Sequence, residues 1–236
     1  MTSFRFKQFV VRQDLSPMKV GTDGVLLGAW ATVRASDRRM LDIGTGTGLI
    51  ALMLAQRAPQ ARIAGIDIEE VAEARANADA SPWGERIEMV QESAQTFSPG
   101  GRFDLVVSNP PFFDGSLPCP DAGRTAARHT VRLSFEELRD AAVRLLAPEG
   151  RFAVVLPADA ATRFIALCCG PLDLVRRTDV RTTPRRPAKR VLLEFTPAGA
   201  GPAPVPERTE LTVGTGEHEC YTPEYRALTR DFYLRF

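Results

Sequence analysis

Short apolar runs alternate with helix-like segments from about residue 40 to residue 168. The runs have the length and the β-branched content of strands, whereas the segments between them place apolar residues three and four positions apart, as one face of a helix does. Repeated alternation of this kind predicts an α/β fold, with a mostly parallel sheet and helices on both faces. Strands are expected over 40–43, 62–66, 87–90, 103–108 and 151–156, and helices over 49–57, 69–78 and 158–168 and after the capping box of Ser134 and Glu137.

The segments on either side of this core have different patterns. Residues 4–12 alternate as a short half-buried strand does, and a glycine-punctuated turn at 18–24 leads into an apolar helix. Near the other end, strand candidates at 172–176 and 191–195 enclose a basic segment that we expect to be a loop. We interpret this pair as an antiparallel hairpin that ends a seven-stranded, Rossmann-like sheet.

The last part of the chain begins with a linker. Residues 197–206 are too rich in Pro and Gly to pack regularly. After them, Thr222 and Pro223 have the pattern of an N-cap followed by the first residue of a helix. A chain of 236 residues is long enough for one sizeable domain. We expect that domain to comprise an N-terminal extension, a Rossmann-like core, and the linker with its helix, over 1–33, 34–197 and 198–236.

Composition and charge narrow the class of protein. A hydrophobic content of 44% and a charged content of 25% are typical of globular proteins, and the net charge of +1 gives no overall basic field. No apolar run approaches a membrane span and residues 1–7 have no signal-peptide core, so we expect a cytoplasmic protein with no membrane partner. The four cysteines lack metal-ligand spacing, which indicates reduced thiols and no bound metal. Nothing in the sequence implies an obligate protein partner.

A glycine-rich turn follows the first predicted strand of the core. Asp42 lies in that strand, Gly44, Gly46 and Gly48 alternate after it, and Asp67 ends the next strand. In a doubly wound sheet, cofactors bind at the carboxyl ends of the strands, where such a turn lets the backbone approach the ligand. A nicotinamide cofactor would bring a pyrophosphate next to Asp42, whereas S-adenosylmethionine offers an amino group to Asp42 and ribose hydroxyls to Asp67. We therefore favour S-adenosylmethionine over a nicotinamide cofactor or a purely structural turn. The neighbouring residues that we add to the cofactor-binding set are Thr45, Ile68 and Ser93.

A second motif follows the strand predicted over 103–108. It consists of Asn109, Pro110, Pro111 and Phe112, which we predict to be the catalytic residues. Proline fixes its own φ and restricts the residue before it, so the Asn109 carboxamide and the Pro110 carbonyl are held stiffly. These two acceptors suit the N–H groups of an amino group on a planar ring, and Phe112 suits stacking on that ring. The alternative interpretation is a Pro-rich turn after an ordinary strand.

Together, the two motifs resemble those of class I S-adenosylmethionine-dependent methyltransferases that modify exocyclic or amide nitrogens. The segments at 4–9 (FRFKQF), 18–30 (MKVGTDGVLLGAW) and 125–130 (TAARHT) are similar to those of the bacterial tRNA1(Val) adenine-N6-methyltransferases, which modify the adenine directly 3′ of the anticodon. The resemblance implies the same reaction on a tRNA substrate. Many relatives have tyrosine where Phe112 stands. A phenyl ring can still stack on the base, so this departure removes only the contribution of the tyrosine hydroxyl. The resemblance also implies that the methionine end of the cofactor is lined by Lys19, Thr22 and Asp23.

Basic residues gather in one stretch of the sequence. Seven arginines and lysines lie between positions 176 and 190, with Asp179 as the only acid among them. Such a cluster suits the phosphates of RNA, and the alternative interpretation is a solvated face of the fold. Two alternatives remain. Sites of this type also methylate guanine N2 of ribosomal RNA or a glutamine of release factors. A protein of a different class, a catalytically silent module that binds S-adenosylmethionine or RNA, is the second alternative. The residues that we expect to bind the tRNA are Arg5, Lys7, Arg128, Arg181, Arg185 and Arg186.

Overall fold

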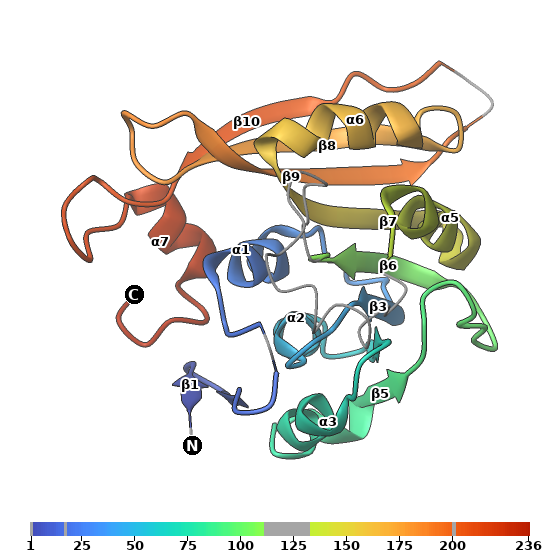
Figure 1. The fold of residues 1–236 in the computed structure, drawn as a ribbon, viewed down its shortest axis with the longest axis horizontal. Coiled ribbons are helices and arrows are strands. Elements are labelled where there is room, and N and C mark those ends of the chain that lie inside the picture. The colour runs from blue at the N-terminus through green and yellow to red at the C-terminus, as the bar shows by residue number, and fades with distance from the viewer. Residues whose placement is uncertain (1, 17, 111–132, 200–201) are drawn as a thin grey trace, which may run out of the picture.

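The computed structural model describes residues 2–16, 18–110, 133–199 and 202–236. Within these ranges, eight strands form the central sheet in the order β10-β8-β9-β7-β6-β3-β4-β5 (Figure 1). β9 runs antiparallel to both of its neighbours, and every other neighbouring pair is parallel. The strands are β3 (Arg39–Ile43), β4 (Arg62–Asp67), β5 (Ile87–Gln91), β6 (Phe103–Ser108), β7 (Leu146–Pro157), β8 (Leu172–Arg181), β9 (Ala188–Pro197) and β10 (Glu207–Thr212).

Helices cover both faces of this sheet (Figure 1). One face is packed by α1, α2, α3 and α7, and the other by α5 and α6. Along β3, Met40 belongs to the first hydrophobic cluster and Leu41 to the second, which is the alternation of a strand buried on both faces. The predicted α/β fold is confirmed. The helices are α1 (Thr22–Trp30), α2 (Leu49–Arg57), α3 (Ala72–Asp79), α5 (Phe135–Leu145), α6 (Ala158–Cys168) and α7 (Pro223–Thr229), with a 3-10 turn at Gly84–Arg86.

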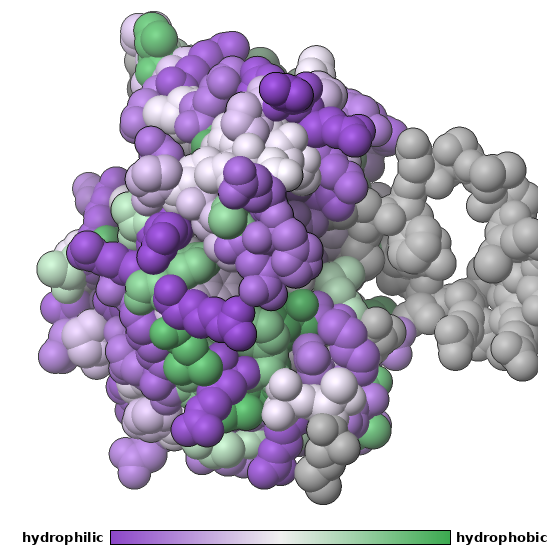
Figure 2. Space-filling view, turned by 90° about the vertical axis from the view of Figure 1, so that its left-hand side faces the viewer, coloured by the Kyte–Doolittle hydropathy of each residue, from purple (hydrophilic) through white to green (hydrophobic). Residues whose placement is uncertain are grey.

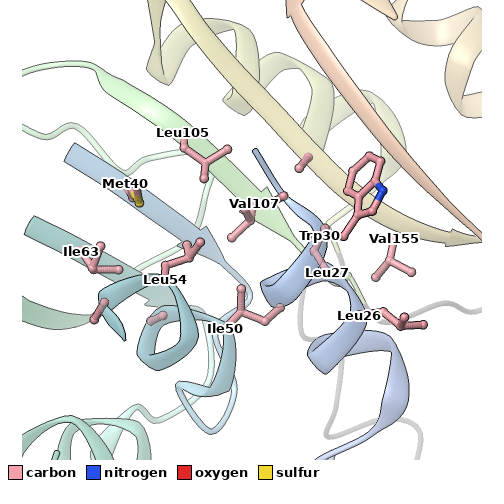
Figure 3. Close-up of a cluster of buried hydrophobic side chains, with 14 of the residues drawn as sticks. Leu26, Leu27, Trp30, Met40, Ile50, Leu54, Ile63, Leu105, Val107 and Val155 are labelled. Carbon is pink, nitrogen blue, oxygen red and sulfur yellow. The ribbon is translucent and has the colours of Figure 1, made fainter. Parts of the chain in front are cut away.

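The first cluster fixes α1 and α2 against the sheet (Figure 3). Leu27 of α1 and Leu54 of α2 are fully buried in the same cluster as Leu105 and Val107 of β6. Complete burial of one such side chain stabilises the fold by about 1.5–3 kcal/mol relative to an exposed one. Because β6 carries the predicted catalytic motif at its end, this packing places α1 rigidly beside that motif.

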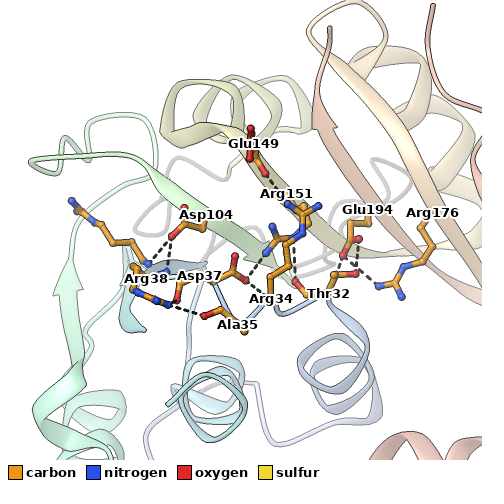
Figure 4. Close-up of polar contacts among 11 residues, drawn as sticks. Thr32, Arg34, Ala35, Asp37, Arg38, Asp104, Glu149, Arg151, Arg176 and Glu194 are labelled. Carbon is orange, nitrogen blue, oxygen red and sulfur yellow. Dashed lines mark hydrogen bonds and ion pairs between the residues drawn. The ribbon is translucent and has the colours of Figure 1, made fainter. Parts of the chain in front are cut away.

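Buried polar contacts fix the segment that follows α1 (Figure 4). Arg151 of β7 and Asp37 form an ion pair at 2.5 Å, and both side chains are 2% exposed. Glu194 of β9 accepts hydrogen bonds from the backbone N–H and the hydroxyl of Thr32, at 2.9 and 2.8 Å, and pairs with Arg176 at 3.3 Å. In the Arg151–Asp37 pair each charge compensates the other, so removing one leaves its partner charge buried and uncompensated. This network holds the end of α1 in place relative to β7 and β9.

The sheet extends further than the sequence predicts. β10 adds an eighth strand, parallel to β8, within the 198–236 stretch in which we expected only a linker and a helix. Leu211 is the buried residue of this edge strand, so the alternation that identifies a strand is weak there. β8 also continues to Arg181. As a result, Arg177 and Arg181 lie on a strand and not in the expected loop.

The N-terminal residues form a hairpin where one strand was expected over 4–12. β1 (Ser3–Arg5) pairs antiparallel with β2 (Val10–Arg12). Phe6 and Phe9, between these strands, are buried in a cluster that also contains Phe232, which follows α7. Lys7 Nζ donates to the backbone carbonyls of Arg230 and Phe236, the second at 2.7 Å. The hairpin is therefore attached to the segment that follows α7.

Candidate functional site

The carboxyl ends of β3, β4 and β6 meet at one edge of the sheet. These strands are parallel neighbours, with Ile43 opposite both Ile66 and Ser108. The hydroxyl of Ser108 donates to the carbonyl of Ile43 at 2.9 Å, which binds the ends of β6 and β3 together. The glycine turn after β3 and the predicted catalytic motif after β6 therefore start from adjacent points. This edge is the candidate active site.

The turn after β3 requires glycine. Gly44, Gly46 and Gly48 have φ values of 73°, 53° and 82°, a region that residues with a side chain rarely adopt. A Cβ placed on Gly44 or Gly46 meets nothing within 4 Å, whereas one on Gly48 would lie 3.0 Å from Cε of Met89. The first two glycines thus border open space, as a ligand-binding turn needs, and the third permits close packing.

Asp67 supports the turn from the neighbouring strand. Its Oδ2 accepts the backbone N–H of Gly46 at 2.9 Å, and its Oδ1 accepts that of Glu69 at 3.0 Å. The N–H of Thr45 donates to the carbonyl of Ile66 at 3.0 Å, which adds a backbone bond between the turn and β4. An ionised carboxylate offers about four acceptor positions. Asp67 therefore has acceptor capacity left for the hydroxyl groups of a ligand.

Asp42 is the buried carboxylate of the site. Its side chain is 0% exposed, and its Oδ2 accepts the hydroxyl of Thr45 at 2.7 Å and the N–H of Ala51 at 3.3 Å. Its Oδ1 has no hydrogen-bond partner among the described residues. Burial raises the pKa of Asp42 to about 7 despite those two hydrogen bonds, and the charge of Asp67 adds to the increase. A buried polar atom without a partner is costly, and a ligand amino group beside Oδ1 would supply one.

Asn109 and Pro110 follow β6 at the same edge. The Nδ2 of Asn109 lies 4.0 Å from Sδ of Met18, and a Cβ placed on Gly24 of α1 would lie 3.9 Å from that nitrogen. α1 thus passes close to the carboxamide, and the segment before it contacts the carboxamide directly. Met18 was not predicted as a site residue, because a single methionine forms no recognisable pattern. Three predicted site residues lie outside the described residues, namely Pro111, Phe112 and Arg128.

The predicted residues at the methionine end of the cofactor lie in or just before α1. Lys19 Nζ donates to the carbonyl of Gln13, and Asp23 accepts a hydrogen bond from Nε of Arg190 at 2.7 Å. Thr22 is exposed at the first position of α1. The positive charge of Lys19 and the negative charge of Asp23 are therefore engaged within the protein. Their roles toward a cofactor remain predictions.

Ile68 and Ser93 lie after β4 and β5, the strands on the far side of the glycine turn from β6. Ile68 directly follows Asp67 and is 41% exposed, so it presents apolar surface at this edge of the sheet. The Ser93 hydroxyl lies 2.9 Å from that of Thr96 in the loop after β5. An exposed apolar surface beside polar loop atoms suits one face of a flat ring, so adenine remains the predicted ligand group here.

Comparisons with known proteins test the family assignment. A family described as "Methyltransferase small domain" matches residues 21–166. A tRNA1(Val) (adenine(37)-N6)-methyltransferase of Phocaeicola vulgatus is 48% identical over 98% of this chain and 97% of its own. Proteins with the same name from Bacteroides thetaiotaomicron and Trichodesmium erythraeum are 46% and 43% identical, over 98% and 99% of this chain and 97% and 98% of theirs. This chain belongs to the tRNA1(Val) (adenine(37)-N6)-methyltransferase family. The resemblance recognised from the motifs is confirmed.

Solved structures of other methyltransferases share the fold. A predicted O-methyltransferase of Agrobacterium tumefaciens superposes with a TM-score of 0.69 at 18% identity, over 89% of this chain and 96% of that one. A putative class I S-adenosylmethionine-dependent methyltransferase of Listeria monocytogenes gives a TM-score of 0.59 at 12% identity, over 87% and 68% of the two chains. At these identities the similarity concerns the fold alone.

In this methyltransferase the predicted RNA-binding residues fall into two groups. Arg185 and Arg186 are exposed in the turn between β8 and β9, and Arg181 precedes that turn, where it pairs with Glu210 at 3.1 Å. Since β8 is antiparallel to β9 and β9 to β7, this turn lies at the same edge of the sheet as the ends of β6 and β7. In the second group, Arg5 is exposed on β1 and Lys7 is bound by backbone carbonyls. The structure therefore brings the turn to the active-site edge, whereas Lys7 already has a structural partner.

A surface hollow adjoins the turn between β8 and β9. It has a volume of about 440 Å³, and its walls come from Thr182 and Thr183 and from the loop after β10. The N–H of Gly214 donates to the carbonyl of Thr182 at 3.0 Å, so the two loops form one surface. On the face that carries α7 and these loops, hydrophilic residues cover most of the surface and hydrophobic residues gather in its lower half (Figure 2). This hollow was not predicted from the sequence, because β10 itself was missed.

The described residues of this methyltransferase favour an organic cofactor at the turn. The open space at Gly44 and Gly46, the unpartnered oxygen of Asp42 and the remaining acceptors of Asp67 match the amino group and ribose of S-adenosylmethionine. Within residues 2–16, 18–110, 133–199 and 202–236, no group of three or more His, Cys, Asp or Glu is arranged to hold a metal ion. In the same ranges, no helix has both the length and the apolar character needed to cross a membrane.

Proposed function

We propose that this protein transfers the methyl group of S-adenosylmethionine to the exocyclic N6 of an adenine in tRNA, with adenine 37 of tRNA1(Val) as the substrate. One structural observation carries the proposal: the glycine turn after β3 and Asn109 after β6 start from strand ends that the Ser108–Ile43 hydrogen bond joins at 2.9 Å. A cofactor on the turn is then adjacent to the acceptors that suit an amino group. The names of relatives that are 43–48% identical over nearly the whole chain specify the nucleotide.

The chain's own residues hold the two ends of the cofactor. Asp42 offers its free Oδ1 to the amino group of the methionine moiety, and Asp67 accepts from the ribose hydroxyls. Ile68 and Ser93 lie where they would flank the adenine, as one apolar and one polar neighbour. When bound, S-adenosylmethionine supplies a methyl group on a sulfonium ion, which is strongly activated toward nucleophiles.

Asn109 and Pro110 prepare the target nitrogen. The lone pair of an adenine amino group is delocalised into the ring, which makes the nitrogen a weak nucleophile. The Asn109 carboxamide oxygen and the Pro110 carbonyl accept its two N–H bonds, and this favours a pyramidal nitrogen with an available lone pair. Correct positioning of nucleophile and donor lowers the barrier without a general base, and the surplus N–H proton leaves to water after the transfer.

The basic turn between β8 and β9 holds the RNA. Arg185 and Arg186 are exposed at the active-site edge, where they neutralise phosphates next to the target nucleotide. A base in an anticodon loop is single-stranded, so it can enter the site without the opening of a duplex. A tRNA substrate also places the reaction in the cytoplasm.

The test combines cofactor binding with nucleoside mass spectrometry. Wild-type protein, labelled S-adenosylmethionine and unmodified tRNA are expected to give labelled N6-methyladenosine among the nucleosides of the tRNA. Asn109→Ala is expected to lose at least about 100-fold in rate, because positioning is lost, while it still binds S-adenosylhomocysteine. Asn109→Asp keeps an acceptor oxygen in the same place and serves as the matched control that retains measurable activity.

Each other outcome contradicts a defined part of the proposal. Label in ribosomal guanine or in a release factor would exclude the tRNA substrate but keep the site. Loss of cofactor binding in Asn109→Ala would contradict the role of Asn109. Cofactor binding without any methyl transfer to RNA or protein would contradict the enzymatic function.

A further inference from the structure

The described residues between β2 and α1 are 13–16 and 18–21, and Gln13 binds the end of this segment that leads into α1. Its backbone carbonyl accepts a hydrogen bond from Lys19 Nζ, and its side-chain oxygen accepts the N–H of Val20 at 2.7 Å. Gln13 is 9% exposed, so these bonds are largely shielded from water. The end of the segment that precedes α1 is therefore bound to Gln13, the residue at which the segment begins.

Glu73 of α3 holds the first part of this segment. Its Oε1 accepts the backbone N–H groups of Asp14 and Leu15 at 2.6 and 3.0 Å, and its Oε2 accepts that of Ser16 at 2.8 Å. Burial opposes its ionisation, but the hydrogen bonds outweigh burial and keep the pKa of Glu73 below its usual value. Three converging N–H groups form a site for an anion and bind a carboxylate more strongly than a neutral acceptor. Glu73 is thus a specific anchor.

Asn77, one helical turn after Glu73, connects the same region to the glycine turn. Its Oδ1 accepts the N–H of Arg12 at 2.8 Å, and its Nδ2 donates to the carbonyls of Arg12 and Thr47, both at 2.9 Å. Thr47 lies between Gly46 and Gly48. The face of α3 that bears Glu73 and Asn77 therefore fixes the N-terminal segment relative to the cofactor turn.

We propose that Glu73 is a positioning residue for the cofactor site. It fixes residues 14–16 and, together with the bonds of Gln13 to Lys19 and Val20, keeps Met18 at its 4.0 Å contact with Asn109. Met18 is 50% exposed, so it presents apolar surface beside the Asn109 carboxamide. The inference rests on the proposed binding of S-adenosylmethionine at this edge. According to this inference, α3 affects the affinity for the cofactor although it belongs to neither of the two motifs.

The experiment measures S-adenosylhomocysteine binding by calorimetry and amide hydrogen exchange of the cofactor-free protein. In Glu73→Gln, the side-chain NH2 faces a backbone N–H and repels it, so the amides of residues 14–16 are expected to lose protection. The dissociation constant is expected to rise about tenfold, because only the fraction of molecules with the segment in place binds tightly. Asp79→Asn, an exposed change of the same charge on the same helix, is the matched control and is expected to bind as the wild type does.

A second variant tests the contribution of Met18 without a change in α3. Met18→Ala truncates a half-exposed side chain, so it leaves the core intact, and it is expected to weaken binding about threefold through lost apolar contact. Unchanged affinity in Glu73→Gln with lost protection at residues 14–16 would overturn the inference, as would unchanged affinity in Met18→Ala. Wild-type protein that fails to bind S-adenosylhomocysteine would instead contradict the proposed function.

Discussion

Replacement of Asp42 by asparagine is expected to make the cofactor-free protein more stable at alkaline pH. The ordinary pKa of an aspartate side chain is 3.8, and burial raises the pKa of Asp42 to about 7 in the folded state. The folded protein therefore binds this proton more tightly than the unfolded chain does. The stability that the group contributes is greatest at low pH and is lost as the pH rises from the unfolded value through the folded one.

The size of the effect follows from the shift of the pKa of Asp42. One pKa unit corresponds to 1.36 kcal/mol, so full ionisation of Asp42 costs about 4 kcal/mol, of which about 3 kcal/mol accrues between pH 5 and pH 8.5. Asparagine has no such cost, but it places an NH2 group where Oδ1 has no partner among the described residues, and an unpaired donor costs about 1–3 kcal/mol. At pH 8.5, Asp42→Asn is expected to be more stable than the wild type by about 1–3 kcal/mol.

Urea unfolding of both proteins at pH 5 and pH 8.5 measures this difference, since titration of all other groups cancels between them. Asp79→Asn, which makes the same charge change at an exposed position, is the matched control. S-adenosylhomocysteine is expected to bind Asp42→Asn weakly, because the amino group loses its anionic partner. A stability difference between the two proteins that does not change between pH 5 and pH 8.5 would refute the raised pKa of the buried Asp42 carboxylate.

Three further variants test the scaffold and the RNA surface. Asp37→Ala leaves Arg151 buried without its partner and is expected to lower the free energy of unfolding by about 3–5 kcal/mol, as measured by urea denaturation; a loss below about 1 kcal/mol would contradict the buried pair. Ser134→Ala removes the capping box of α5 and is expected to cost about 1 kcal/mol in the same assay. Arg185→Ala with Arg186→Ala is expected to weaken tRNA binding and to reduce the slope of log affinity against log salt by about 0.7–0.9 for each lost phosphate contact, with S-adenosylhomocysteine binding unchanged; an unaltered slope would remove the turn from the RNA surface.

The core of the fold was predictable because its local signals agree. β6, α2 and α6 have the predicted bounds, since apolar periodicity and turn residues mark the same ends. β7 begins at Leu146, earlier than the predicted start at residue 151, because the strand continues through Pro148 and Gly150, two residue types that normally weaken a strand. α3 begins at Ala72, after the predicted start at residue 69. Such differences arise where tertiary pairing overrides local propensity.

The candidate site was predictable as two motifs but not as one assembled site. The glycine pattern and the Asn109 motif are contiguous in sequence, so each could be recognised alone. Glu73 and Asn77 were not predicted, because a polar pair four residues apart normally marks the solvent face of a helix. Their partners are backbone groups of the N-terminal segment and the glycine turn, which have no signature in the sequence. Long-range hydrogen bonds of this kind become visible only once the chain is folded.

The attachment of the N-terminal hairpin to the segment after α7 sets the order in which this enzyme can be assembled on the ribosome. Lys7 and Arg230 are separated by 223 positions, and Phe6 shares its cluster with Phe232. Contacts between residues so distant in sequence form late, after the closure entropy of the intervening chain has been overcome. The central sheet up to β9 can pair while synthesis continues, but the hairpin gains its buried aromatic partner only after the final helix has emerged. The N-terminal hairpin, which is translated before the central sheet, is therefore completed after it.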